Sequence, residues 1–125
     1  MKKLMLSMAA ILGLSMTAAA HEGHEGSAHD EAAEMQTIKG EVLDMACYID
    51  HNATGEKHAD CAKTCALSGL PVGLKGENGK TYLLIGEHKP ANEMLAPYAG
   101  KTITVRGKVA SRDGINMIEN VEVVK

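Results

Sequence analysis

The sequence has no tryptophan and no phenylalanine, and three tyrosines are the only aromatic residues among its 125 positions. Proteins that bind nucleic acid need a basic surface to follow the phosphates, and those that bind single strands also stack bases on aromatic side chains. Here the formal net charge is −3, with 16 acidic against 13 basic residues. The shortage of both aromatic and basic side chains argues against nucleic-acid binding.

No hydrophobic run is long enough to span a bilayer comfortably, but a shorter one opens the chain. Lys2 and Lys3 are followed by an apolar stretch, residues 4–16, and by small residues up to Ala20. This order is typical of a secretory signal peptide, here residues 1–20. Its removal takes away two lysines and leaves 105 of the 125 residues with a net charge of −5, enough for one small domain. We therefore expect a periplasmic or secreted protein without a membrane anchor.

Histidine is concentrated in residues 21–36, a run with acidic residues and glycines but no apolar periodicity. Such a composition predicts a disordered arm. His21, His24 and His29 offer imidazole ligands, and cleavage after Ala20 would add the free amine of His21 as another nitrogen donor. The arm is therefore either a weaker second site for a divalent metal or a flexible solubilising leader.

Residues 37–125 consist of short runs that alternate with a period near two and are separated by turn signals. Asn78-Gly79 is a strong hairpin signal, because both central residues of such a turn need a positive φ. Gly40 indicates either a bulge or a close backbone approach in the first strand. The expected strands run from residue 38 towards 47 and then over residues 71–74, 81–85, 102–109 and 115–124.

A short helix over residues 91–96 is expected between the third and fourth strands, since Pro90 precedes it and Pro97 follows it. Five strands with a helix at this point match the order of a small OB-type barrel. The sequence therefore predicts a mainly β domain, a five-stranded OB-like Greek-key barrel. No internal repeat is visible, so we expect a single domain.

The unusual part of this barrel is an insertion between its first two strands, residues 50–69. Its pattern predicts a helix from about Glu56 to Ser68, with Gly69 placed to end it and Pro71 preventing its continuation. The chain has three cysteines, and two of them lie in this helix. We expect the insertion to carry the chemistry.

A metal site is the first interpretation of the cysteines. On a helix, His58, Cys61 and Cys65 cover an arc of about 60° on one face, and Cys47 could complete the set from the neighbouring strand. Three thiolates and one imidazole form a tetrahedral site for Zn²⁺ and a soft site for Cu(I). Two further side chains are candidate ligands: His51 in place of His58, and Met45, expected on the same strand face as Cys47, as a thioether ligand of copper.

The same residues resemble a pattern in a group of small exported bacterial proteins with OB-like barrels. In that group a strand ending in Asp-x-x-Cys-Tyr is followed by His-x-x-Cys-Ala-x-x-Cys and then by Gly-x-Pro. The matching residues here are Asp44, Cys47, Tyr48, His58, Cys61, Ala62, Cys65, Gly69 and Pro71. The resemblance covers roughly residues 40–124 and implies the barrel fold and an important cysteine cluster. The members are mostly uncharacterised, so it implies no reaction.

A structural disulfide is the second interpretation, since exported proteins commonly form disulfides. Pairing Cys47 with Cys61 or Cys65 would tie the insertion to the barrel. Closing a loop of about fifteen residues in this way stabilises by roughly 3 kcal/mol. One cysteine would then remain unpaired. Thiol–disulfide exchange is the third interpretation, but the chain has no Cys-x-x-Cys motif in a βαβ context.

The sequence favours a non-enzymatic exported protein that binds one copper or zinc ion per chain at the cysteine cluster. Its role would be metal buffering or delivery to a periplasmic metal-handling protein. The alternatives are an interaction module with a structural disulfide and a thiol–disulfide redox protein. No haem-attachment motif and no glycine-rich phosphate loop are present, so we do not expect an enzyme.

Overall fold

The computed structural model describes residues 35–125. The expected signal peptide and residues 21–34 of the expected histidine-rich arm lie outside the described residues, whereas Met35 and Gln36, expected in that arm, belong to the first strand. Within residues 35–125, no helix has the length and apolar character needed to cross a membrane. The described part of the chain comprises the barrel and its helical insertion.

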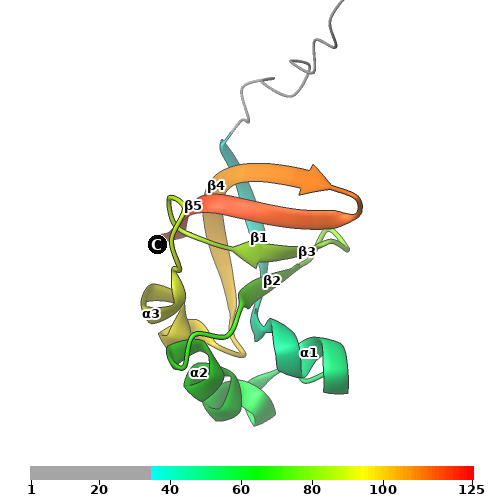
Figure 1. Ribbon diagram of the computed structural model, residues 1–125, viewed down its shortest axis with the longest axis vertical. Helices are drawn as coiled ribbons and strands as arrows, with labels where there is room; N and C mark the ends of the chain where they lie inside the picture. The colour runs from blue at the N-terminus through cyan, green and yellow to red at the C-terminus, as the bar shows by residue number, and fades with distance from the viewer. Residues whose placement is uncertain (1–34) are drawn as a thin grey trace, which may run out of the picture.

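Five strands form a closed barrel in the order β1-β2-β3-β5-β4 (Figure 1). The strands are β1 (Met35–Asp44), β2 (Val72–Gly76), β3 (Thr81–Leu84), β4 (Thr102–Arg112) and β5 (Ile115–Val124). Neighbouring strands are antiparallel except β3 and β5, which are parallel. The predicted five-stranded OB-like barrel is therefore confirmed, with helices between β1 and β2 and between β3 and β4 as expected.

Large aliphatic side chains fill the inside of the barrel. Leu74, Val105 and Ile118 are fully buried, and they belong to one cluster with Val42 and Leu84. Burying one such side chain contributes about 1.5 to 3 kcal/mol. The alternation seen in the sequence arises because successive side chains of a strand point to opposite faces.

Gly40 marks a close backbone approach and not a bulge. It pairs with Gly76 across β1 and β2, and a Cβ atom on Gly40 would lie 2.9 Å from the Gly76 Cα. Any side chain there would push the two strands apart. The register shift that the structure does contain lies between Arg106 and Lys108 in β4.

The expected hairpin joins β2 and β3, but its turn differs from the expectation. Gly79 has a φ of +84°, whereas Asn78 is not among the residues with positive φ. The Gly79 amide donates to the Gly76 carbonyl, which closes a turn ending in a left-handed glycine. Asn78 contributes through its side chain, which accepts from the Lys80 amide and donates to the Tyr82 hydroxyl.

The insertion begins earlier than the sequence predicted. β1 ends at Asp44 and the chain turns directly into α1 (Met45–His51), so the expectation of a strand reaching Cys47 is wrong. The expected helix is present as a short 3₁₀ turn, η1 (Glu56–His58), followed by α2 (Ala59–Leu67). The reason for the early turn is the side chain of Asp44, which caps α1.

Glycine ends α2 as predicted. Gly69 has a φ of +99°, its amide donates to the Ala66 carbonyl, and the Leu70 amide donates to the Cys65 carbonyl. This is a Schellman ending. The Asn92 side chain donates to the Ala66 and Leu70 carbonyls at 2.8 and 2.7 Å, which fixes the end of α2 to the other helical segment.

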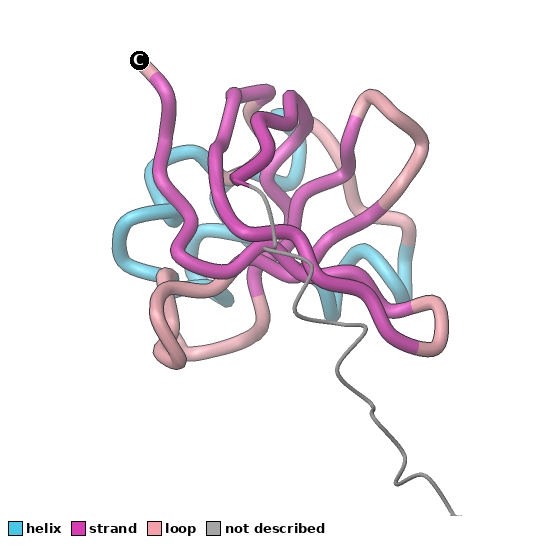
Figure 2. The backbone as a smooth tube through the Cα atoms, turned by 90° about the horizontal axis from the view of Figure 1, so that it is seen from above, coloured by secondary structure: helices cyan, strands magenta, loops and turns pink. Residues whose placement is uncertain are grey.

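That other segment consists of α3 (Asn92–Leu95) and a 3₁₀ turn, η2 (Ala96–Tyr98). Leu95 is fully buried and belongs to the barrel core. The helices α1, α2 and α3 lie at one end of the barrel (Figure 1). A view turned by 90° shows the strands winding around one another with the helical turns behind them (Figure 2).

Candidate metal centre

The three cysteines come together from two helices. Cys47 is the third residue of α1, whereas Cys61 and Cys65 lie one turn apart on α2. Their sulfur atoms all lie within 4.8 Å of one another. The predicted cluster is thus confirmed for its cysteines, although Cys47 reaches it from a helix and not from a strand.

Asp44 connects the barrel to this cluster. As the N-cap of α1 it accepts a hydrogen bond of 2.7 Å from the Cys47 amide through Oδ1. Such a cap fixes the first turn of a helix and therefore the position of Cys47. The residue is only 2% exposed, and apart from the Cys47 thiol no group among the described residues donates to its other oxygen, Oδ2. A buried carboxylate with so few donors is costly unless a cation or a further donor is supplied.

The carboxylate of Asp44 also controls the nearest thiol. Its hydrogen bond with the thiol, assisted by burial and by its negative charge, raises the pKa of Cys47 from 9.0 to about 12. Burial raises the pKa of Cys65, with the charge of Asp44 acting in the same direction and a hydrogen bond with Cys47 acting against it. Cys47 is therefore protonated at neutral pH. A metal ion must displace this proton, because the thiolate is the ligand.

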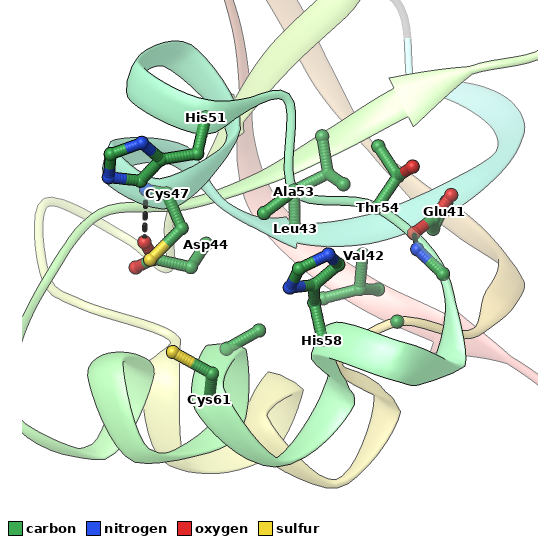
Figure 3. A pocket seen from close by; sticks show the side chains of 13 residues that line it. Glu41, Val42, Leu43, Asp44, Cys47, His51, Ala53, Thr54, His58 and Cys61 are labelled. Carbon is green, nitrogen blue, oxygen red and sulfur yellow. Dashed lines mark hydrogen bonds between the residues drawn. The ribbon is translucent and has the colours of Figure 1, made fainter.

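A cavity of about 210 Å³ opens beside the cluster. Cys47 and Cys61 line it, whereas Cys65 does not. Figure 3 shows the Cys47 side chain above the Cys61 side chain, with the Asp44 carboxylate beside Cys47. Two of the three sulfurs therefore face a space that solvent or a small molecule can enter.

His51 and His58 line the same cavity, and both residues are exposed. Within the part of the chain that the structure describes, the group of potential ligand atoms within 4.8 Å of one another contains the three cysteines and no histidine. His58 lies just before α2, at its N-cap position, so it does not continue the helical face of the cysteines. His51 lies on α1 one turn after Cys47, so both histidines line the cavity without belonging to the group. The expected second site at His21, His24 and His29 lies outside the described residues.

Met45 packs against the barrel. It is the first residue of α1 and not part of β1, so the expectation that it shares a strand face with Cys47 is wrong. A Cβ atom on Gly73 would overlap the Met45 sulfur, which places the thioether over β2. Met45 does not line the cavity.

Several contacts hold the insertion against the barrel. The Met45 amide donates to the Pro71 carbonyl at 2.9 Å, and the Gly55 amide donates to the Glu41 carboxylate. The ammonium group of Lys75 lies 5.5 Å from the centre of the Tyr48 ring, within the range of a cation–π interaction. These contacts fix α1 and the loop after it, and so hold Cys47 beside α2.

Asp44 is the site residue that sequence reasoning missed. It entered only as part of the Asp-x-x-Cys pattern, without a role. The side chain of an N-cap aspartate accepts a hydrogen bond from a backbone amide a few residues later, which fits the spacing of Asp44 and Cys47. The Asp-x-x-Cys motif was therefore a signal for the start of α1. This signal was overlooked because a continuous strand was expected here.

All three cysteines are free thiols in the structure. The chain matches no protein-family model, and neither the curated proteins nor the solved structures yield a match. The resemblance to small exported bacterial proteins thus has no named relative to support it. What is established is a small five-stranded barrel with a three-cysteine cluster that could hold a metal ion.

Proposed function

We propose that the protein is a non-enzymatic, exported metal-binding protein that holds one copper or zinc ion through Cys47, Cys61 and Cys65. The observation that carries this proposal is the convergence of three cysteine sulfurs from two helices, all within 4.8 Å of one another. Three thiolates that converge in this way repel one another unless a cation lies between them. A disulfide would use two of the three sulfurs and leave the third unpaired.

The raised pKa of Cys47 weighs against thiol–disulfide exchange. Reactive thiols have a lowered pKa, which makes the thiolate abundant at neutral pH. Here the nearest charged group is a carboxylate, and the pKa of Cys47 is about 12. The arrangement disfavours a free thiolate and favours one that is formed only when a metal ion replaces the proton.

The spacing of the sulfurs suits thiolate coordination. Zn–S bonds are about 2.3 Å long, so sulfurs at tetrahedral angles lie about 3.8 Å apart. The three sulfurs lie within 4.8 Å of one another, so small side-chain rotations bring them to that separation. Soft sulfur ligands suit Cu(I) equally well, which leaves copper and zinc as the two ions to test.

Buffering or delivery is the role that fits such a site on an exported protein. His21, His24 and His29 would form a weaker site that collects metal before it reaches the cysteines. Deleting residues 21–29 should then slow metal uptake at limiting metal and leave the final stoichiometry unchanged. Uptake at the same rate as in the intact chain would rule out this relay.

The test of the main proposal is a titration of the reduced protein with Zn²⁺ and with Cu(I) against a competing chelator. The three variants Cys47→Ser, Cys61→Ser and Cys65→Ser should each lose affinity by about a hundredfold or more, because each removes one thiolate. Lys63→Ala is the matched control, since Lys63 is an exposed residue of α2 between the two cysteines. If the cysteines were structural, Cys47→Ser would leave metal binding unchanged and cost roughly 3 kcal/mol of stability under oxidising conditions.

A further inference from the structure

The cavity beside the three cysteines, which we call the chamber, has a lining that differs along its length. Its deeper walls are apolar and buried, formed by Val42, Leu43, Ala53 and Ala62. Polar side chains line it at both ends, with Asp44 and Cys47 at one end and Glu41 and Thr54 at the other (Figure 3). Between these ends the apolar walls give water few hydrogen bonds.

An ion held by the three sulfurs would have this chamber on the side of Cys47 and Cys61, since Cys65 does not line it. Three protein ligands leave a fourth position in a tetrahedral site, and an open position is what separates reactive zinc sites from structural ones. His58 and His51 line the chamber but lie outside the group of close ligand atoms in the described chain. In this arrangement the fourth position would face the chamber and be open to a ligand that enters it.

We propose that this chamber binds a small thiol-bearing ligand whose sulfur completes the coordination of the ion. The inference rests on the proposed metal site. A soft sulfur donor suits an ion that already has thiolate ligands, and a short apolar stem suits the apolar walls. The ligand is either a free low-molecular-weight thiol or the cysteine side chain of a protein that exchanges metal with this one.

The size of the chamber limits the ligand. An apolar cavity of about 150 Å³ accepts a benzene molecule. The chamber measures about 210 Å³, so a stem of a few carbon atoms fits and a folded peptide segment does not. A cysteine side chain on an extended loop can reach in from outside.

The experiment uses the protein loaded with Co²⁺, whose visible spectrum reports the number and type of its ligands. Propanethiol should change the spectrum with a stoichiometry of one per chain, whereas 1-propanol, of the same shape but with a hard oxygen donor, should not. The tripeptide Gly-Cys-Gly tests the second source of the thiol. A response to propanethiol alone indicates a free thiol, and a response to the tripeptide indicates a protein side chain.

Filling the chamber provides the structural test. Ala62→Val and Ala53→Val each narrow it from a different wall and should weaken propanethiol binding by about tenfold or more. Their affinity for Co²⁺ should change little, and Lys63→Val on the exposed side of α2 is the matched control. Two variants are used so that poor folding of one leaves the other as the test.

The outcomes separate the two proposals. If the protein binds Co²⁺ but neither thiol changes the spectrum, the chamber is not a ligand site while the metal site remains. If His58→Ala or His51→Ala changes the spectrum before any thiol is added, that histidine already occupies the fourth position and the inference fails. If Co²⁺, Zn²⁺ and Cu(I) all fail to bind, the proposed function itself is wrong and the inference falls with it.

Discussion

The barrel and its helical insertion are held together in different ways. Leu74, Val105 and Ile118 in the barrel are fully buried. The buried hydrophobic residues of the insertion are alanines, while Ile49 and Leu67 are 72% and 56% exposed. Apolar burial thus stabilises the barrel strongly and the insertion weakly. The insertion contains instead three sulfurs and a buried carboxylate, so we infer that an ion completes it.

The strongest way to test this difference is to remove the metal. A ligand at a thousand times its dissociation constant stabilises the state that binds it by about 4 kcal/mol, close to a thousandfold in local opening. Hydrogen exchange of amides in α1 and α2 should therefore accelerate by up to about a thousandfold on chelation. Amides of β2 and β4 should exchange at unchanged rates. Equal acceleration of exchange in the barrel and in the insertion would contradict the idea that the metal stabilises mainly the insertion.

A substitution that removes a buried apolar side chain should destabilise the barrel more than the insertion. Leu74→Ala removes a fully buried side chain of β2 and should lower the free energy of unfolding by about 2 to 5 kcal/mol. Leu67→Ala in α2 is the paired variant, and it should change that free energy by about 0.5 kcal/mol or less because the side chain is 56% exposed. Urea titrations measure both. Equal losses would mean that the insertion depends on apolar packing as the barrel does.

Asp44→Asn tests the link between the two regions. The amide keeps the size of the side chain and an oxygen for the Cys47 amide, but it removes the negative charge. Metal affinity should fall by about ten- to hundredfold, as is typical when a group that supports a ligand is altered. A competition titration measures this loss. Unchanged affinity would mean that the carboxylate acts only as a helix cap.

The pH dependence of metal binding gives a smaller effect with a definite sign. Protons compete with the metal for thiolates, so affinity rises with pH as long as a ligand thiol remains protonated. The pKa of Cys47 is raised from 9.0 to about 12, so the rise should continue above pH 9.0. For this one proton the rise is about tenfold per pH unit. In Asp44→Asn the slope above pH 9.0 should be shallower, because the hydrogen bond and the charge that raise the pKa of Cys47 are altered.

The strands were predictable because their hydrophobic pattern repeats with the period of the backbone. The last strand was expected over residues 115–124, and β5 spans Ile115–Val124. Gly40 was predictable as a contact point, since a glycine within a strand pattern signals a bulge or a close approach. The end of the helix at Gly69 was equally predictable, because only glycine adopts the left-handed backbone conformation of this position at little cost.

The candidate site was predictable in composition and less so in geometry. The helical spacing of Cys61 and Cys65 indicated a shared face, which the structure confirms. Two features depended on side-chain hydrogen bonds to the backbone, which the hydrophobic periodicity does not reveal. Asp44 caps a new helix where a strand was expected, and Asn78 uses its side chain where a left-handed backbone was expected. The cavity arises from tertiary packing of α1, α2 and β1, so no sequence window contains it.

Metal binding would be tested by native mass spectrometry of the mature protein taken from the exported fraction, with parallel counting of thiols. We expect one copper or zinc ion per chain and the release of three reactive thiols when the ion is chelated, one for each cysteine of the chain. A chain without metal, lighter by two hydrogen atoms and with a single free thiol, would contradict it. The cysteines would then form a structural disulfide, and the function would have to be sought elsewhere on the barrel.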